Sequence, residues 1–209
     1  YSRTYKHKLT DMTKQAKIIS FANHKGGVGK TTTTASVGSI LASMGKKVLL
    51  VDMDAQSNLT TSLLKDNQVD QTIYDALSAS CRGTAYSLAI YPIAENLDIV
   101  PSSLRLASAD LELSSVMARE HILTDILQEK KADYDYILID CPPSLGLLTL
   151  NAVTASDLVV IPLLAEVLPF QGLTMISDFV RMVKQKLNPK IEITGILLTR
   201  WEKSNLSRQ

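Results

Sequence analysis

The sequence contains little cysteine, little net charge and no long apolar run, and each shortage excludes a class of protein. Its two cysteines, Cys81 and Cys141, are too far apart for a CxxC site and too few for a disulfide framework. This usage is typical of a reduced, cytoplasmic protein. The formal net charge of +1 provides no overall field toward nucleic acid or membrane, so any such binding must come from a local patch.

The apolar runs are of strand length and are broken by charges or prolines, so none predicts a membrane-spanning helix. The start of the sequence shows no apolar core of a secretory signal, and no internal repeat is visible. These features predict a soluble intracellular protein.

The 209 residues, 45% of them hydrophobic, are enough to bury one substantial core. We therefore expect a single domain over residues 15–209. Residues 1–14 are polar, basic and aperiodic, and are expected to form a disordered extension or remnant, with Met12 a candidate for the natural start.

Apolar runs of strand length alternate with segments of helical periodicity. The expected strands are 17–23, 48–52, 97–100, 136–140, 157–162 and 191–198. The first expected helix follows the glycine-rich stretch and ends near Gly45. Further helices are expected at 72–79, starting near 104, around 122–127 and at 170–187. This alternation predicts the α/β class, with a doubly wound, mainly parallel sheet flanked by helices. Its ligand crevice should lie at the carboxyl ends of the strands.

The stretch KGGVGKTT lies between the first expected strand and a helix identified by Val37, Ile40, Leu41 and Met44. Glycines there let backbone N–H groups converge on phosphate oxygens at the positive end of the helix. The stretch fits the phosphate-loop pattern GxxxxGK[ST] with His24 in place of the first glycine. A glycine-rich turn without a ligand is the alternative. The residues expected to bind the nucleotide are Lys25, Gly26, Gly27, Val28, Gly29, Lys30, Thr31 and Thr32.

Position within the loop assigns Lys30 to the β- and γ-phosphates of ATP and the Thr31 hydroxyl to Mg²⁺. Magnesium also takes one or two carboxylates. Asp140 ends an apolar strand, as a Walker B aspartate does, and is the expected carboxylate ligand. An aspartate that caps the turn after the strand is the alternative interpretation.

An additional lysine, Lys25, matches the deviant loop form KGGxGK[ST], and here the sequence resembles the ParA/MinD family of dimerising P-loop ATPases. The segment DCPPSLG after the strand at 136–140 resembles the family's switch II. Within the family, the motifs favour the Soj-like, ParA-type partition ATPases of chromosomes and plasmids. The resemblance extends from about residue 17 to 209. Relatives continue further, so we expect the chain to lack its C-terminal portion.

The resemblance also implies roles for two aspartates and for Lys25. The DxD pattern in VDMDAQSN places Asp52 near Mg²⁺ and makes Asp54 the residue that orients the attacking water. Lys25 is implied to reach across a dimer interface to the partner's phosphates, which makes Lys25, Lys30 and Asp54 the expected catalytic set. Ordinary turn-forming aspartates and a solvated lysine are the alternatives.

The function that the resemblance implies is an ATPase that forms a homodimer on ATP and Mg²⁺, binds DNA nonspecifically and is reset by hydrolysis. A ParB-like partner protein would stimulate that hydrolysis. The protein would act in the bacterial cytoplasm in association with the nucleoid, without stable membrane association. The alternatives are a MinD-like membrane-associated positioning ATPase and a nucleotide-gated binding module with little hydrolysis.

Two further features have both an ordinary and a functional interpretation. Cys141 directly follows an apolar strand, and we interpret it as a small buried hydrophobe rather than an iron–sulfur ligand of the kind found in the nitrogenase iron protein. Arg181, Lys184 and Lys186 lie opposite the apolar stripe of the helix at 170–187. A solvated helix face is the ordinary interpretation, and DNA contact is the functional one.

Overall fold

The computed structural model describes residues 15–64, 69–165 and 170–200, and the expected alternation of strands and helices is present in them. The strands are β1 (Lys17–Phe21), β2 (Val48–Asp52), β3 (Tyr91–Ala94), β4 (Leu97–Val100), β5 (Tyr136–Asp140), β6 (Leu158–Leu164) and β7 (Glu192–Thr199). The helices are α1 (Lys30–Ser43), α2 (Asn58–Leu63), α3 (Ile73–Cys81), α4 (Ala109–Ser114), α5 (Ile122–Gln128), α6 (Leu147–Ala155) and α7 (Phe170–Lys186), with 3₁₀ turns η1 (Leu104–Ser108) and η2 (Arg119–His121). The predicted extension at 1–14 lies outside the described residues.

The strands form one sheet in the order β3-β4-β2-β5-β1-β6-β7, and every neighbouring pair is parallel except β3 and β4. This confirms the predicted α/β fold with a mainly parallel sheet. Parallel register sets Asp140 at the end of β5 beside Phe21 of β1 on one side and Asp52 of β2 on the other. The strand β3 and the helix α2 were not predicted, because segments of four and six residues are too short to show a distinct periodic pattern.

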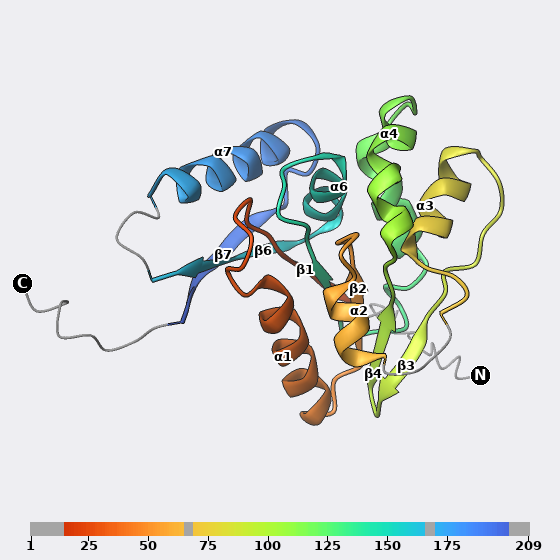
Figure 1. The fold of residues 1–209 in the computed structure, drawn as a ribbon, viewed down its shortest axis with the longest axis horizontal. Helices are drawn as coiled ribbons and strands as arrows, with labels where there is room; N and C mark the ends of the chain where they lie inside the picture. Colours follow the sequence, from red (N-terminus) through yellow and green to blue (C-terminus); the bar gives the residue numbers. More distant parts are fainter. Residues whose placement is uncertain (1–14, 65–68, 166–169, 201–209) are drawn as a thin grey trace, which may run out of the picture.

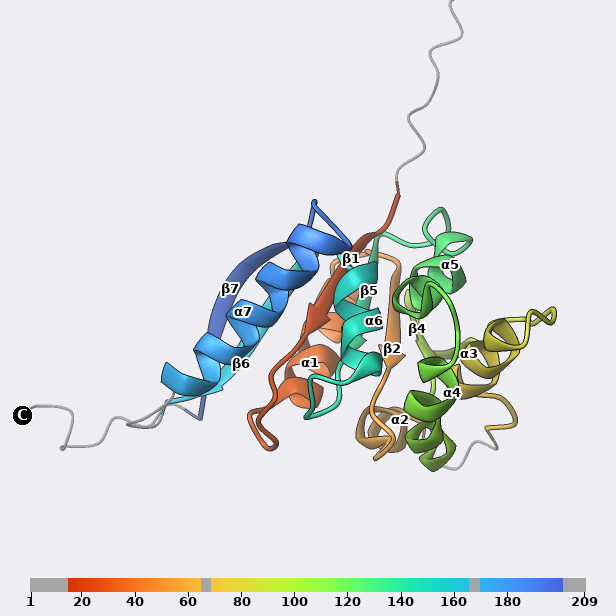
Figure 2. The ribbon, with the colours of Figure 1, turned by 90° about the horizontal axis from the view of Figure 1, so that it is seen from above.

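Helices cover both faces of the sheet (Figure 1). One apolar cluster contains residues of α1 and α2 packed on strand residues such as Val48, Leu50 and Leu138. The other contains residues of the helices from α3 through α7, packed on Leu49, Val51 and Ile137. Alternate residues of β2 thus face opposite layers, as a strand buried on both sides requires. Figures 1 and 2 show α7 along β6 and β7 at one end of the sheet, and α3 and α4 at the end with β3 and β4.

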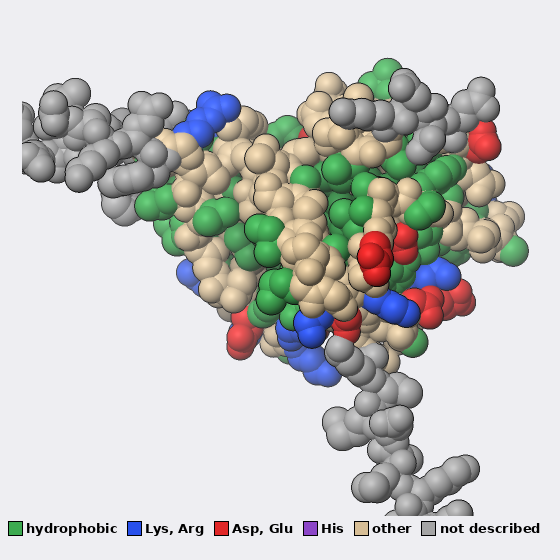
Figure 3. Space-filling model, turned by 90° about the horizontal axis from the view of Figure 1, so that it is seen from below, with side chains coloured by type: hydrophobic (Ala, Val, Ile, Leu, Met, Phe, Trp, Pro, Cys, Tyr) green, Lys and Arg blue, Asp and Glu red, His purple; other side chains and the backbone are tan. Residues whose placement is uncertain are grey.

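The apolar residues that identified α1 in the sequence do not all face the core. Ile40 and Met44 are 59% and 66% exposed, and Figure 3 shows hydrophobic side chains at the surface on this side of the molecule. The buried side of α1 is instead made of small and polar residues, and a Cβ at Gly38 would lie only 2.6 Å from Leu50 Cδ2. Helix α1 therefore packs closely on the sheet through its small residues.

The amphipathic helix predicted at 170–187 is confirmed by α7. Its inward stripe includes Ile176, Val180 and Val183, which are all buried. In the parts of the chain that the structure describes, no helix combines the length and apolar character needed to cross a bilayer.

Candidate functional site

The loop between β1 and α1 has a backbone that requires glycine at two positions. Gly27 and Gly29 have φ angles of 72° and 86°, in the left-handed region that other residues rarely adopt. Gly29 immediately precedes Lys30, the first residue of α1. The loop therefore delivers its N–H groups to the amino end of a 14-residue helix, where an anion is favoured.

The side chain of Lys30 is held over this loop by a backbone carbonyl of the loop. Its Nζ donates a hydrogen bond to the carbonyl oxygen of Lys25 at 3.1 Å, and the residue is only 7% exposed. Burial lowers the pKa of Lys30, while the nearby carboxylate of Asp140 acts in the opposite direction. The ammonium group is thus aimed at the loop before any ligand arrives.

Two strands outside the loop, β6 and β7, fix its shape. Asn23 donates from Nδ2 to the carbonyl oxygen of Pro162 in β6 at 2.8 Å, and its Oδ1 accepts from Lys25 N at 3.0 Å. Thr199, the last residue of β7, donates from Oγ1 to the carbonyl oxygen of Val28 at 2.9 Å. Sequence reasoning missed both anchors, because their role depends on a strand order that places β6 beside β1 and β7 beside β6.

His24, which stands where the general loop pattern has glycine, lies against α7. A Cβ at Gly172 would be 2.7 Å from His24 Cε1, so a larger residue at 172 would require the imidazole to move. The departure from the general pattern is therefore matched by a small residue on the neighbouring helix.

A cavity of about 650 Å³ opens in front of the loop, which is a size suited to a small molecule. Asp54 and Arg200 contribute charged side chains to it, from the segment after β2 and from the end of β7. Arg200 was not predicted as a site residue. The cavity is lined by Gly26, Gly27, Gly29, Lys30, Thr31, Thr32, Ala35, Ser36, Asp54, Gln56, Asn58, Ser62, Leu63, Pro143 and Arg200.

Asp140 is a buried carboxylate whose two oxygens accept no hydrogen bond from the described protein atoms. Burial raises its pKa to about 7; the Thr31 hydroxyl lies close enough to oppose the rise, but not in hydrogen-bond geometry. An unpaired buried carboxylate is costly unless a cation neutralises it. Asp140 and Thr31 therefore fit a magnesium ion, which prefers oxygen ligands.

Asp52 lies beside Asp140 but has a different environment. Its Oδ2 accepts from Thr60 N at 2.9 Å and Thr60 Oγ1 at 2.7 Å, and its Oδ1 accepts from Asp54 N at 3.1 Å. Burial raises the pKa of Asp52 to about 6, and the hydrogen bonds from Thr60 oppose that rise. Asp52 thus holds α2 in place, a structural function that sequence reasoning missed, and its place near the metal stays a prediction.

The position of Asp54 agrees with both of its interpretations, a turn-forming aspartate and a residue of the candidate site. Its Oδ1 accepts from Gln56 N at 3.0 Å, which is the geometry of a turn-forming aspartate. The same half-buried residue lines the cavity. Its role in orienting the attacking water stays a prediction.

Three other predicted features can be placed. Lys25 is exposed, whereas Lys30 is buried. Cys141 is 1% exposed, in agreement with the buried-hydrophobe interpretation, and burial raises the pKa of its thiol.

Of the basic residues on α7, Arg181 pairs with Asp178 at 2.8 Å and Lys184 lies 4.0 Å from Glu192. These acidic neighbours reduce the positive charge of that face.

Together, the strand, glycine loop, helix and crevice at the carboxyl edge of the sheet define a P-loop NTPase fold. The family described as "AAA domain" matches residues 16–193. The sporulation initiation inhibitor protein Soj of Bacillus subtilis is 47% identical over 184 residues, which are 88% of this chain and 72% of that protein. The chromosome partitioning protein ParA of Myxococcus xanthus is 43% identical over 196 residues, covering 92% of this chain and 68% of the relative.

Solved structures agree with these relatives. Cobyrinic acid a,c-diamide synthase from Mycobacterium smegmatis with bound ADP and magnesium has a TM-score of 0.83 at 36% identity, over 90% of this chain and 76% of that one. A plasmid partition protein from Borrelia burgdorferi has a TM-score of 0.76 at 34% identity, over 91% of this chain and 81% of that one. The chain belongs to the ParA/MinD family of P-loop ATPases and is of the ParA type.

Proposed function

We propose that this protein is a partition ATPase that binds ATP and Mg²⁺, dimerises in the ATP state, binds DNA nonspecifically and is reset by ATP hydrolysis. The observation that carries the proposal is the unpaired, buried carboxylate of Asp140 beside Lys30 and Thr31 at the phosphate loop. A glycine turn with only a structural function would not need a buried lysine and, close to it, an unpaired buried carboxylate. The relatives named Soj and ParA support the partition role.

Phosphoryl transfer depends mainly on positioning and charge stabilisation, and different residues of the chain have different roles in it. Loop N–H groups and Lys30 bind the β- and γ-phosphates, and Asp54, which lines the cavity, orients the attacking water. Thr31 and Asp140 would hold Mg²⁺, which when bound neutralises charge on the phosphates. Arg200, which lines the same cavity, adds a positive charge that favours an anionic ligand.

The partners proposed are a second copy of the chain, nonspecific DNA and a ParB-like protein that stimulates hydrolysis in the bacterial cytoplasm. The net charge of +1 and the acidic neighbours of Arg181 and Lys184 give one subunit only weak attraction for DNA. Two linked subunits would double such a weak surface and bind with higher avidity.

DNA binding should therefore depend on ATP and be insensitive to sequence. The ATP-loaded protein is expected to bind DNA fragments of unrelated sequence equally, and to lose binding steeply as salt rises because counterions are released on binding. Fluorescence anisotropy with two unrelated duplexes, with ATP, with ADP and without nucleotide, measures this. Equal binding without nucleotide, or binding to one duplex only, would contradict the proposed cycle.

Lys25 should act on the nucleotide of the partner subunit. Its backbone carbonyl accepts from Lys30 while the residue itself is exposed, as a group acting in trans requires. Lys25→Ala is expected to retain ATP binding by the monomer and to lose both the ATP-dependent dimer and hydrolysis. Calorimetry, light scattering and phosphate release measure the three properties. The exposed Lys47 provides the control, and Lys47→Ala should change none of them.

Mixing two inactive variants gives the sharper measurement. In a mixed dimer of Lys25→Ala and Lys30→Ala subunits, the Lys25→Ala subunit keeps its own Lys30 and receives Lys25 from its partner. At most one working site per mixed dimer is therefore expected, and any recovered hydrolysis must come from the Lys25→Ala subunit. A Lys25→Ala protein that dimerises and hydrolyses ATP normally would show that the lysine has no role in trans.

A further inference from the structure

Asp110 on α4 contacts the first turn of α6, at the end of the loop that follows Asp140. Its Oδ1 accepts a hydrogen bond from Leu148 N at 3.2 Å, and its Oδ2 lies 3.0 Å from the place where a Cβ would stand at Gly146. The first N–H groups of a helix have no partner within the helix, and a carboxylate there is also favoured by the helix dipole. The Asp110 carboxylate thus binds the start of α6 from another segment of the chain.

The loop between β5 and α6, residues 141–146, passes along the candidate site. Its Pro143 lines the cavity, and Pro143 Cβ lies 3.9 Å from the place of a Cβ at Gly26 in the phosphate loop. Within the loop, the Ser144 carbonyl accepts from Thr149 Oγ1 at 2.6 Å. One end of the loop is therefore fixed by β5, and the other end is fixed by α6 and by Asp110.

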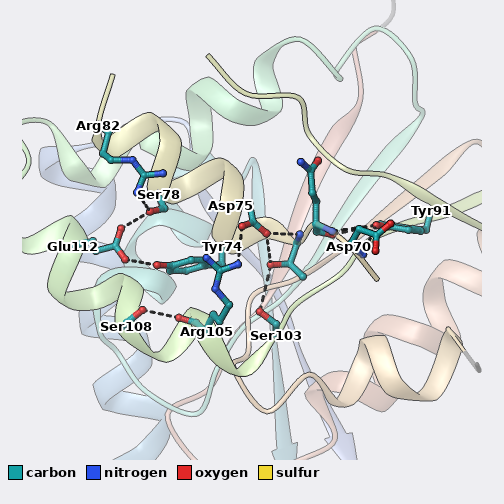
Figure 4. Close-up of polar contacts among 12 residues, drawn as sticks. Asp70, Tyr74, Asp75, Ser78, Arg82, Tyr91, Ser103, Arg105, Ser108 and Glu112 are labelled. Carbon is teal, nitrogen blue, oxygen red and sulfur yellow. Dashed lines mark hydrogen bonds and ion pairs between the residues drawn. The ribbon is translucent and has the colours of Figure 1, made fainter. Parts of the chain in front are cut away.

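The helix that carries Asp110 is itself held by polar contacts to α3 (Figure 4). Glu112, two residues further along α4, accepts hydrogen bonds from the Tyr74 hydroxyl at 2.6 Å and from the Ser78 hydroxyl at 2.5 Å. Arg105 pairs with Asp75 at 2.9 Å and lies over the Tyr74 ring, 4.4 Å from its centroid. These contacts tie η1 and α4 to α3, so the position of Asp110 is set by a group of elements rather than by one short helix.

We infer that Asp110 is a positioning residue that holds the 141–146 loop in the arrangement needed for ATP hydrolysis. The inference rests on the proposed ATPase function. Asp110 does not line the cavity, so it acts through Gly146 and Leu148 on the loop that joins Asp140 and Pro143 to α6. Its loss should affect the rate of the chemical step, which depends on the placement of groups around the γ-phosphate, more than the affinity for ATP.

The first variant to make is Asp110→Ala. Its kcat for ATP is expected to fall roughly tenfold, while the Kd for ATP from calorimetry changes by less than about twofold. In the nucleotide-free protein, amide hydrogen exchange in the segment 142–149 should become faster, a readout that does not depend on activity. Asp110→Asn keeps an acceptor for Leu148 N and should restore most of the rate and of the protection. Asp125→Ala, at an exposed aspartate on α5, is the control and should match wild type in all three measurements.

Gly146→Ala tests the same contact from the other side. The added methyl would meet Asp110 Oδ2 at 3.0 Å and should displace the carboxylate, so this variant should show a lowered kcat like that of Asp110→Ala. The double variant should be no slower than the slower single variant, because Asp110→Ala has already removed the carboxylate that the methyl would displace. Additive losses would overturn the inference, as would an Asp110→Ala protein with wild-type kcat and exchange. If the wild-type protein binds ATP with Mg²⁺ and the variants give either of these results, only the inference is overturned. If the wild-type protein binds no ATP, the proposed function is overturned as well.

Discussion

Lys30→Ala should abolish measurable ATP binding. The residue is almost fully buried, and its Nζ is already directed over the phosphate loop by the Lys25 carbonyl oxygen. Removing one partner of a buried charge pair commonly costs a few kcal/mol, so ATP affinity should fall on the order of a hundredfold or more. Isothermal titration calorimetry with ATP and Mg²⁺ measures the loss.

Two further variants separate the lost charge from a damaged fold. Lys30→Arg keeps a positive charge, but its planar group does not match the compact ammonium, so only partial binding should return. Lys46→Ala changes a lysine in the turn after α1 and should bind ATP like wild type. Far-ultraviolet circular dichroism should be the same for all of them. ATP affinity at the wild-type level in Lys30→Ala would refute the assignment of the phosphate site.

Asp54→Ala should bind ATP and hydrolyse it about a hundredfold more slowly than wild type, since positioning of an attacking water by a carboxylate contributes on that scale. The residue lines the cavity but makes no part of the phosphate loop, so binding and chemistry should separate. An ATP-bound dimer should accumulate as a result. Single-turnover phosphate release and light scattering with ATP measure the two effects.

Asp54→Asn distinguishes this role from a structural one. Its side-chain oxygen can still accept from Gln56 N, as Asp54 Oδ1 does at 3.0 Å, so the turn should persist while the negative charge is lost. A slow Asp54→Asn supports water orientation, whereas wild-type turnover in this variant would leave Asp54 only a turn-forming function. Asp133→Ala, at an exposed aspartate before β5, provides the control.

Local sequence patterns were sufficient for the central strands and for the phosphate loop. The strands β2, β4 and β5 have the predicted bounds, because continuous apolar runs ended by polar residues or proline leave little freedom in where a buried strand stops. The loop is recognisable because Gly27 and Gly29 need a left-handed backbone and Lys30 must follow at a set spacing. The buried face of α1 was less readable, since Gly38 and two threonines pack there in place of large apolar residues.

The sequence by itself determined the α/β class, the phosphate loop and the aspartates at the ends of β2 and β5, because these depend on residue type and near spacing. Only the tertiary structure decided which carboxylate is unpaired: Asp140 has no hydrogen-bond partner among the described residues, while Asp52 is held by Thr60, eight positions further along. It also brought Thr199 and Arg200 to the site, and Asp110 to the start of α6. Contacts between residues far apart in the chain follow from strand order and helix packing, and neither is encoded in any short window of sequence.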